Sequence, residues 1–151
     1  MFSWYLVLKF IHIASAITAV GANITYGVWN ARIAGDPAHT SFALKGIAFL
    51  DNRIANPAYG VLFITGLIMV FAGHWGFALW VILAIVLFVA VAAIGGAVFT
   101  PLLRNQIKLA DSGVTTSAEF TRLANRSRTI GPLLGLMVVL ILVMMVFKPT
   151  L

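Results

Sequence analysis

One helix face near the N-terminus gathers side chains that could do chemistry. Every third or fourth residue there is polar, small or a tyrosine, whereas the intervening residues are mostly large and apolar. This polar stripe consists of Tyr5, Lys9, His12, Ala16, Ala19, Asn23, Tyr26 and Asn30. Its spacing places all of its members on one face of an α-helix. Because exposing polar side chains to lipid costs free energy, we expect the stripe to face a bundle interior or a cavity.

His12 is the member of the stripe best suited to chemistry. It lies about nine residues into the apolar segment, which is roughly 13 Å by helical rise. A neutral imidazole there needs partners for its N–H and for its lone pair. The partner could be a side chain such as Tyr5 or Thr65, a bound metal, or a neighbour in a proton relay.

Other residues could complete a metal or cofactor site around His12. Lys9 lies one turn away on the same face, where its ammonium could reach the surface or meet an anionic group such as a haem propionate. His74 and Met69 are the candidate second ligands within the chain, and a second copy of His12 across a dimer axis is another. His74 differs from His12 in depth by about 10 Å or more on helical rise. His39, in a charged loop, is expected to be solvated.

Several kinds of chemistry are disfavoured by what the chain lacks. It has no cysteine, which removes thiolate metal sites and a cysteine nucleophile. Its four acidic residues all fall between the apolar segments, which weakens a proton-coupled transport role. There is no glycine-rich phosphate loop and no serine–histidine–aspartate spacing, so the sequence does not favour hydrolysis or phosphoryl transfer.

The elements that must position these residues are membrane-spanning helices. Hydrophobic residues make up 62% of the chain and charged residues only 9%. Apolar stretches cover about residues 2–29, 58–73, 77–103 and 130–147, each near the roughly 20 residues that cross a bilayer. A tight reversal at His74-Trp75-Gly76 separates the second and third stretches. We therefore predict an all-α, integral membrane four-helix bundle forming a single domain over residues 1–151.

The loops predict the orientation of this bundle. Of the ten basic residues, eight lie in the first and third loops: Arg32, Lys45, Arg53, Arg104, Lys108, Arg122, Arg126 and Arg128. In a soluble protein this excess would suggest nucleic acid, but in a membrane protein it marks cytoplasmic loops. We therefore expect both long loops in the cytoplasm, both termini on the non-cytoplasmic side, and no nucleic-acid partner.

Both cytoplasmic loops show helical patterns. In residues 37–55, apolar side chains at helical spacing predict a short interfacial helix, which Asn56-Pro57 should break before the second span restarts. In the third loop, Thr116 and Glu119 have capping-box spacing, so a helix should run from Ser117 through Arg128 into the fourth span. Gly60, Gly66 and Gly73 could let the second span approach a neighbour closely. Asp51 and Arg53 could belong to an interfacial ion-pair network.

Three segments of the chain point to a family. They are WYLVLKFIHIASAITAVGA, with its Lys-x-x-His-Ile signature, DNRIANPAYGVLFITGL, and the closing VLILVMMVFKP. Together they resemble a bacterial family of predicted integral membrane proteins of unknown function. That family is similar to the copper-resistance-D-like membrane proteins and to the four-helix, haem-binding protoporphyrinogen oxidase of bacteria. The resemblance implies a multi-pass protein of the bacterial inner (plasma) membrane.

The resemblance also implies a role for His12. In the oxidase group the first-helix histidine is the expected haem ligand, and His12 and Lys9 match that histidine and its neighbouring lysine. The oxidase carries a further lysine near the start of its third helix, where this chain reads WGFALWVILA. This departure counts against protoporphyrinogen oxidation but not against haem binding. Copper import is also weakly supported, because Cu(I) sites prefer clustered sulfur ligands.

The resulting hypothesis is a membrane protein that binds b-type haem (haem b) through His12 and acts in electron transfer or redox chemistry, as an oxidoreductase if it is an enzyme. Tyr5 and Lys9 would help to bind the cofactor, and His74 or Met69 would supply a second ligand. Expected partners are the lipid bilayer, a redox protein or quinone, and a second copy of the chain. One alternative is a cofactor-free small transporter or assembly partner, which for transport needs a continuous polar path. A further alternative is a protoporphyrinogen oxidase-like enzyme.

Overall fold

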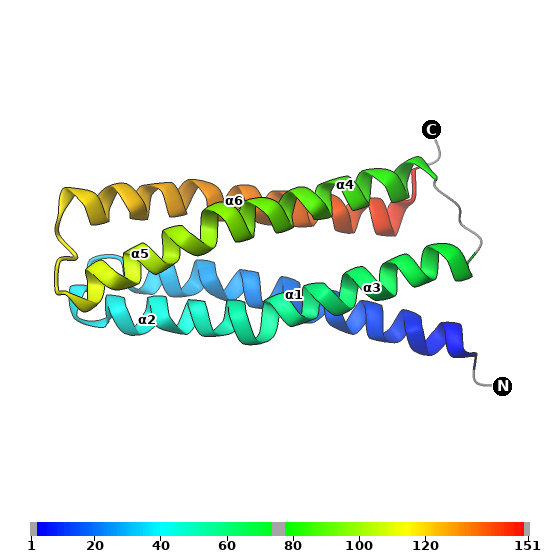
Figure 1. Cartoon of the computed structure of the whole chain (residues 1–151), viewed down its shortest axis with the longest axis horizontal. Coiled ribbons are helices and arrows are strands. Elements are labelled where there is room, and N and C mark those ends of the chain that lie inside the picture. The colour runs from blue at the N-terminus through cyan, green and yellow to red at the C-terminus, as the bar shows by residue number, and fades with distance from the viewer. Residues whose placement is uncertain (1–2, 74–77, 150–151) are drawn as a thin grey trace.

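The protein folds into four helical rods, each long and apolar enough to cross a membrane (Figure 1). The structure is a computed structural model that describes residues 3–73 and 78–149. The first rod is α1 (Trp4–Arg32) and the last is α6 (Ala118–Phe147). The rods between them each consist of two α-helices joined by a π-helical turn. The prediction of an all-α, four-helix, multi-pass membrane protein is confirmed.

The two middle rods share one construction. The second rod comprises α2 (Pro37–Leu50), η1 (Asp51–Ala55) and α3 (Asn56–Ala72). The third comprises α4 (Leu79–Ile94), η2 (Gly95–Phe99) and α5 (Thr100–Asp111). The expected reversal at residues 74–76 and the ligand candidate His74 lie outside the described residues.

The rods are arranged as two pairs that join at one end. Helix α1 packs along α3 and α4 packs along α6, while α2 and α5 bring the pairs together (Figure 1). The start of α1 and the end of α6 lie at one end of the molecule, which we call the terminal end. The connections at residues 33–36 and 112–117 lie at the opposite loop end. Both connections are short, so the two long loops expected from the sequence are largely helical, and they share one end of the molecule.

The predicted break at Asn56-Pro57 is wrong. The chain stays helical from Pro37 to Ala72 over 36 residues, about 54 Å at 1.5 Å per residue. Proline normally interrupts a helix because it lacks an N–H and its ring clashes with the carbonyl four residues earlier. The wider turn of η1, directly before Asn56-Pro57, accommodates the proline without ending the rod. The expected short interfacial helix is therefore the loop-end half of a continuous rod.

The third rod accommodates its proline in the same way. Turn η2 directly precedes Thr100-Pro101. Both the backbone N–H and the hydroxyl of Thr100 donate to the carbonyl oxygen of Gly95, the hydroxyl at 3.0 Å. The rod consequently continues to Asp111, beyond the expected end at residue 103.

Helix α6 begins within the third loop, as predicted, and runs unbroken to Phe147. Its N-cap is Ser117, whose hydroxyl oxygen accepts a hydrogen bond from the backbone N–H of Phe120 at 3.1 Å. The capping-box spacing pointed to Thr116 instead, one residue too early. Ser117 takes the role because the helix begins at Ala118, so Ser117 is the residue with the extended backbone of an N-cap.

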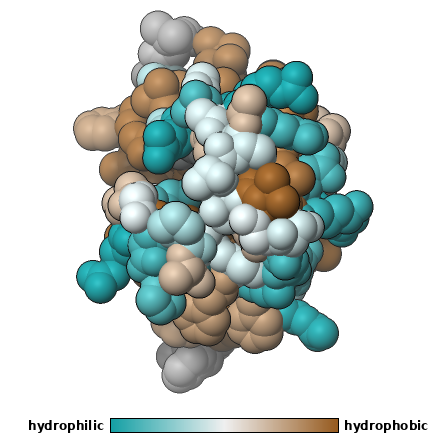
Figure 2. All heavy atoms as spheres, turned by 90° about the vertical axis from the view of Figure 1, so that its left-hand side faces the viewer, coloured by the Kyte–Doolittle hydropathy of each residue, from teal (hydrophilic) through white to brown (hydrophobic). Residues whose placement is uncertain are grey.

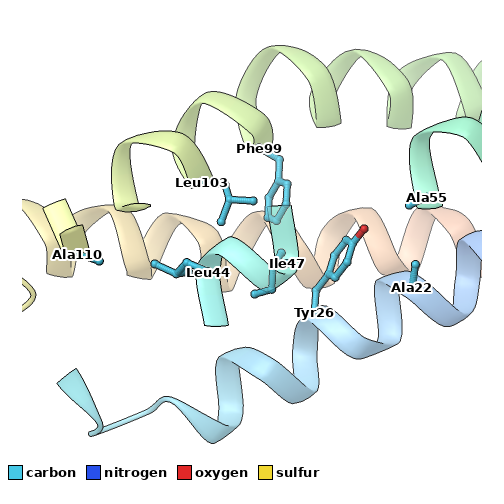
Figure 3. Close-up of a cluster of buried hydrophobic side chains, with 8 residues drawn as sticks. All are labelled: Ala22, Tyr26, Leu44, Ile47, Ala55, Phe99, Leu103 and Ala110. Carbon is cyan, nitrogen blue, oxygen red and sulfur yellow. The ribbon is translucent and has the colours of Figure 1, made fainter. Parts of the chain in front are cut away.

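The buried core lies toward the loop end and joins the two pairs (Figure 3). It contains side chains from both pairs: Ala22, Tyr26, Leu44, Ile47, Ala55, Phe99, Leu103 and Ala110. Polar contacts between α2 and α5 reinforce it, since Ser41 donates to Asp111 and Lys45 pairs with the same carboxylate at 2.7 Å. Outward-facing side chains such as Phe10, 72% exposed, and Ile17, 68% exposed, are those that lipid would cover.

Candidate functional site

The polar stripe of α1 faces the other helices, as its spacing predicted. Ala19 and Tyr26 are buried, and His12 and Asn23 are half-buried. Lys9 departs from this pattern because its side chain is exposed. The helix therefore turns most of its polar face inward and its large aliphatic residues toward lipid.

His12 is held by a hydroxyl on α3. Its Nδ1 lies 3.0 Å from Oγ1 of Thr65, and the same oxygen lies 2.7 Å from the carbonyl oxygen of Val61. A hydroxyl has one hydrogen, and here that hydrogen is directed to the helix backbone. Thr65 therefore accepts from His12 when Nδ1 carries the imidazole proton, and the backbone carbonyl of Leu62 is a second hydrogen-bond partner of the ring. In the neutral ring this leaves the lone pair on Nε2.

Gly66 allows the imidazole to lie close to α3. A Cβ at this position would come within 3.0 Å of Cε1 and 3.6 Å of Nδ1 of His12. Any other side chain would therefore press against the ring edge that faces α3. From the sequence, Gly66 was expected only to help helices pack. Its position directly after Thr65 is the signal that could have linked it to His12.

The remaining candidate residues have less direct roles than His12 and Thr65. Tyr5 is half-buried, and its ring packs edge-on against Trp4 with centroids 6.2 Å apart. Met69 is half-buried and lies one turn beyond Thr65 on the same face of α3, toward the terminal end. His39 is exposed in the first turn of α2, not in a loop as expected, and its Nδ1 lies 2.7 Å from Oδ2 of Asp36. That hydrogen bond lowers the pKa of Asp36.

A second polar cluster lies nearer the loop end, around the start of η1. Asn23 donates to the hydroxyl of Tyr59. Tyr26 donates to Oδ1 of Asp51 at 3.3 Å, and the Asn56 amide donates to Oδ2 at 3.4 Å. Asp51 and Arg53 were expected in an interfacial ion-pair network, but neither forms an ion pair within the described residues, and Arg53 is exposed.

Apolar packing separates the two polar clusters. Between His12 and Asn23 the stripe contributes only Ala16 and Ala19, and Ala19 is completely buried. Small apolar side chains therefore interrupt the stripe between the two polar clusters. Within residues 3–73 and 78–149, no group of three or more histidine, cysteine or acidic side chains could hold a metal ion. The chemistry that this arrangement offers is a single, oriented imidazole nitrogen.

Comparison with known proteins places the chain in one family. A family model described as "Predicted integral membrane protein (DUF2269)" matches residues 6–149, nearly the whole chain. Neither the curated proteins nor the solved structures contain a match to this chain.

Proposed function

The chain belongs to this family of predicted integral membrane proteins, and we propose that it binds b-type haem through Nε2 of His12 and acts in electron transfer or redox chemistry. One observation carries the proposal, namely the hydrogen bond from Nδ1 to Thr65. Histidines that bind metals commonly donate their other ring N–H to a protein group, which fixes both the tautomer and the orientation of the ring. His12 has this arrangement inside an apolar helix pair.

Each nearby residue has a specific part in this proposal. Thr65 orients the ring of His12, and Gly66 leaves space for it. Lys9, exposed one turn away on α1, would meet a haem propionate. Tyr5 would line the cofactor on the same face. The haem, when bound, supplies an iron that changes oxidation state by one electron, and the protein sets its ligation and burial.

The second axial ligand and the electron partner are further parts of the proposal. Met69, His74 or the His12 of a second copy would supply the ligand, and a quinone or redox protein would exchange the electron. A further argument for haem binding is the resemblance to the four-helix oxidase group that the Lys-x-x-His-Ile signature suggests, and this argument rests on sequence motifs alone. Helix α4 contains no lysine, however, so we do not extend the proposal to protoporphyrinogen oxidation.

Haem titration of the purified full chain tests the proposal. We expect the Soret band to shift and its change to saturate as haem is added. Saturation should occur at one haem per chain, or at one haem per two chains if two copies of His12 share the iron. A linear rise without saturation, equal to that of haem in detergent alone, would count against any specific site.

Replacing Thr65 with valine should weaken haem binding by about 10- to 100-fold. Valine retains the size of the side chain but removes the oxygen that accepts from Nδ1 of His12. The ring would then lose its orientation while keeping its ligand atom. Haem titrations of Thr65→Val and Thr65→Ser measure this effect, and the serine variant should stay close to the native affinity. Equal affinities in all three proteins would show that the hydroxyl does not position His12.

The orientation in the membrane is also proposed, with the loop end in the cytoplasm. Because the chain has no cysteine, single cysteines can report the side of each end. In right-side-out membrane vesicles, we expect an impermeant maleimide to label Ser3→Cys, next to α1, but not Ser112→Cys, between α5 and α6. Lysis should make both variants reactive, and the native chain should stay unlabelled. The reverse pattern in intact vesicles would invert the topology.

A further inference from the structure

A shallow, open depression of about 810 Å³, which we call the groove, lies along the loop-end half of α6 and is lined by residues of that helix alone. Its polar lining includes Arg122, Arg126, Asn125 and Thr129, and Ile130 closes it toward the apolar part of the helix. The polar lining residues are exposed, so the groove opens outward rather than into the bundle core. It shares no residue with the site around His12.

The two arginines in this groove form no ion pair among the described residues, although Glu119 lies three residues before Arg122 on the same helix. Arg122 and Arg126 are one turn apart on the same face, and no ion pair in the described part of the chain involves either of them. The carboxylate of Asp111 is already paired with Lys45. The groove therefore presents two adjacent guanidinium groups, which bind phosphate oxygens in a bidentate manner.

The inner part of the groove lies at the depth of lipid phosphates. Residues 130–147 form the apolar part of α6, so Arg126 and Arg122 lie about 6 and 12 Å beyond its edge by helical rise. The headgroup layer on each side of a bilayer is roughly 5 to 8 Å thick, so Arg126 lies within it, whereas Arg122 lies beyond it and reaches it through its long side chain. Below the arginines, Leu133 and Leu140 continue the same face at a spacing of seven residues and are 48% and 39% exposed. One face of α6 thus carries an arginine at the depth of lipid phosphates and, below it, an apolar surface for an acyl chain.

We propose that this groove binds the headgroup of an anionic phospholipid in the leaflet at the loop end. Arg122 and Arg126 contact its phosphate, the Asn125 amide donates to headgroup oxygens, and an acyl chain lies along Leu133 and Leu140. Lipid fits better than a soluble anion because the apolar stripe directly continues the charged one. This inference does not depend on haem binding.

The experiment measures the thermal midpoint (Tm) of the full chain in neutral detergent during titration with phosphatidylglycerol or phosphatidylcholine. We expect phosphatidylglycerol alone to raise the Tm. In Arg122→Gln/Arg126→Gln, the phosphatidylglycerol concentration for half of this rise should increase about 30-fold. A matched control, Arg32→Gln/Lys108→Gln, removes the same charge at exposed positions outside the groove and should respond like the native chain.

Three outcomes would overturn the proposal. Equal responses of the native chain to the two lipids would show that the headgroup charge is not recognised, and this test needs no variant. An unchanged phosphatidylglycerol response in Arg122→Gln/Arg126→Gln would place the lipid elsewhere. An equal Tm rise with millimolar inorganic phosphate alone would replace the lipid with a soluble anion.

Discussion

Replacing His12 with alanine should lower haem affinity by more than about 100-fold, because loss of a supporting partner alone already costs 10- to 100-fold. The proposed iron ligand is Nε2, and no other histidine on α1 could substitute for it. The haem content of the purified variant, determined after extraction into pyridine, measures the effect. The protein should still insert and fold, because His12 is half-buried and contributes no side chain to the main core.

Two controls make the His12 result specific. Asn23→Ala removes another polar group from the same face of α1 and breaks the contact with Tyr59, but it should leave haem content unchanged. Added imidazole should restore a Soret band to His12→Ala, because the alanine leaves space for a free ligand. If His12→Ala retained native haem content, iron ligation by His12 would be refuted.

Replacing Gly66 with leucine should have the second-largest effect. Even the first carbon of the new side chain would lie 3.0 Å from Cε1 of His12, so the ring must move away from α3. That movement breaks the hydrogen bond to Thr65 and shifts Nε2. Overpacking of this kind costs about 1–3 kcal/mol in stability. We expect a lower Tm together with a large loss of bound haem.

Gly60 provides the matched control for Gly66→Leu. It lies on the same helix, but a Cβ there would meet nothing within 4 Å. Gly60→Leu should therefore leave both the Tm and the haem content near their native values. Native haem binding by Gly66→Leu would contradict the close approach of the imidazole to α3.

The sequence predicted the features that depend on hydrophobic pattern. The spans, the inward orientation of the polar stripe and the start of α6 in the third loop all follow from spacing along one segment. Thr65 was also foreseen as a partner for His12. The first three features are determined by residue types and by helical periodicity, whereas the contact with Thr65 also needs α1 and α3 to pack side by side.

The missed features depend on geometry that spacing does not encode. Asn56-Pro57 carries a local stop signal, yet a π-helical turn lets the helix continue, and no residue pattern distinguished the two outcomes. The contact between Tyr26 and Asp51 joins residues 25 apart in the chain and exists only because α1 packs beside η1. The role of Gly66 likewise appears only once the ring of His12 lies across from it.

The most direct test of the central claim is a dithionite-reduced minus oxidised absorption spectrum of the detergent-purified full chain. We predict a Soret band that shifts on reduction, with α and β bands appearing in the reduced protein. A colourless protein that remains colourless after haem is supplied would contradict haem binding. The contact between His12 and Thr65 would then be a packing interaction between α1 and α3.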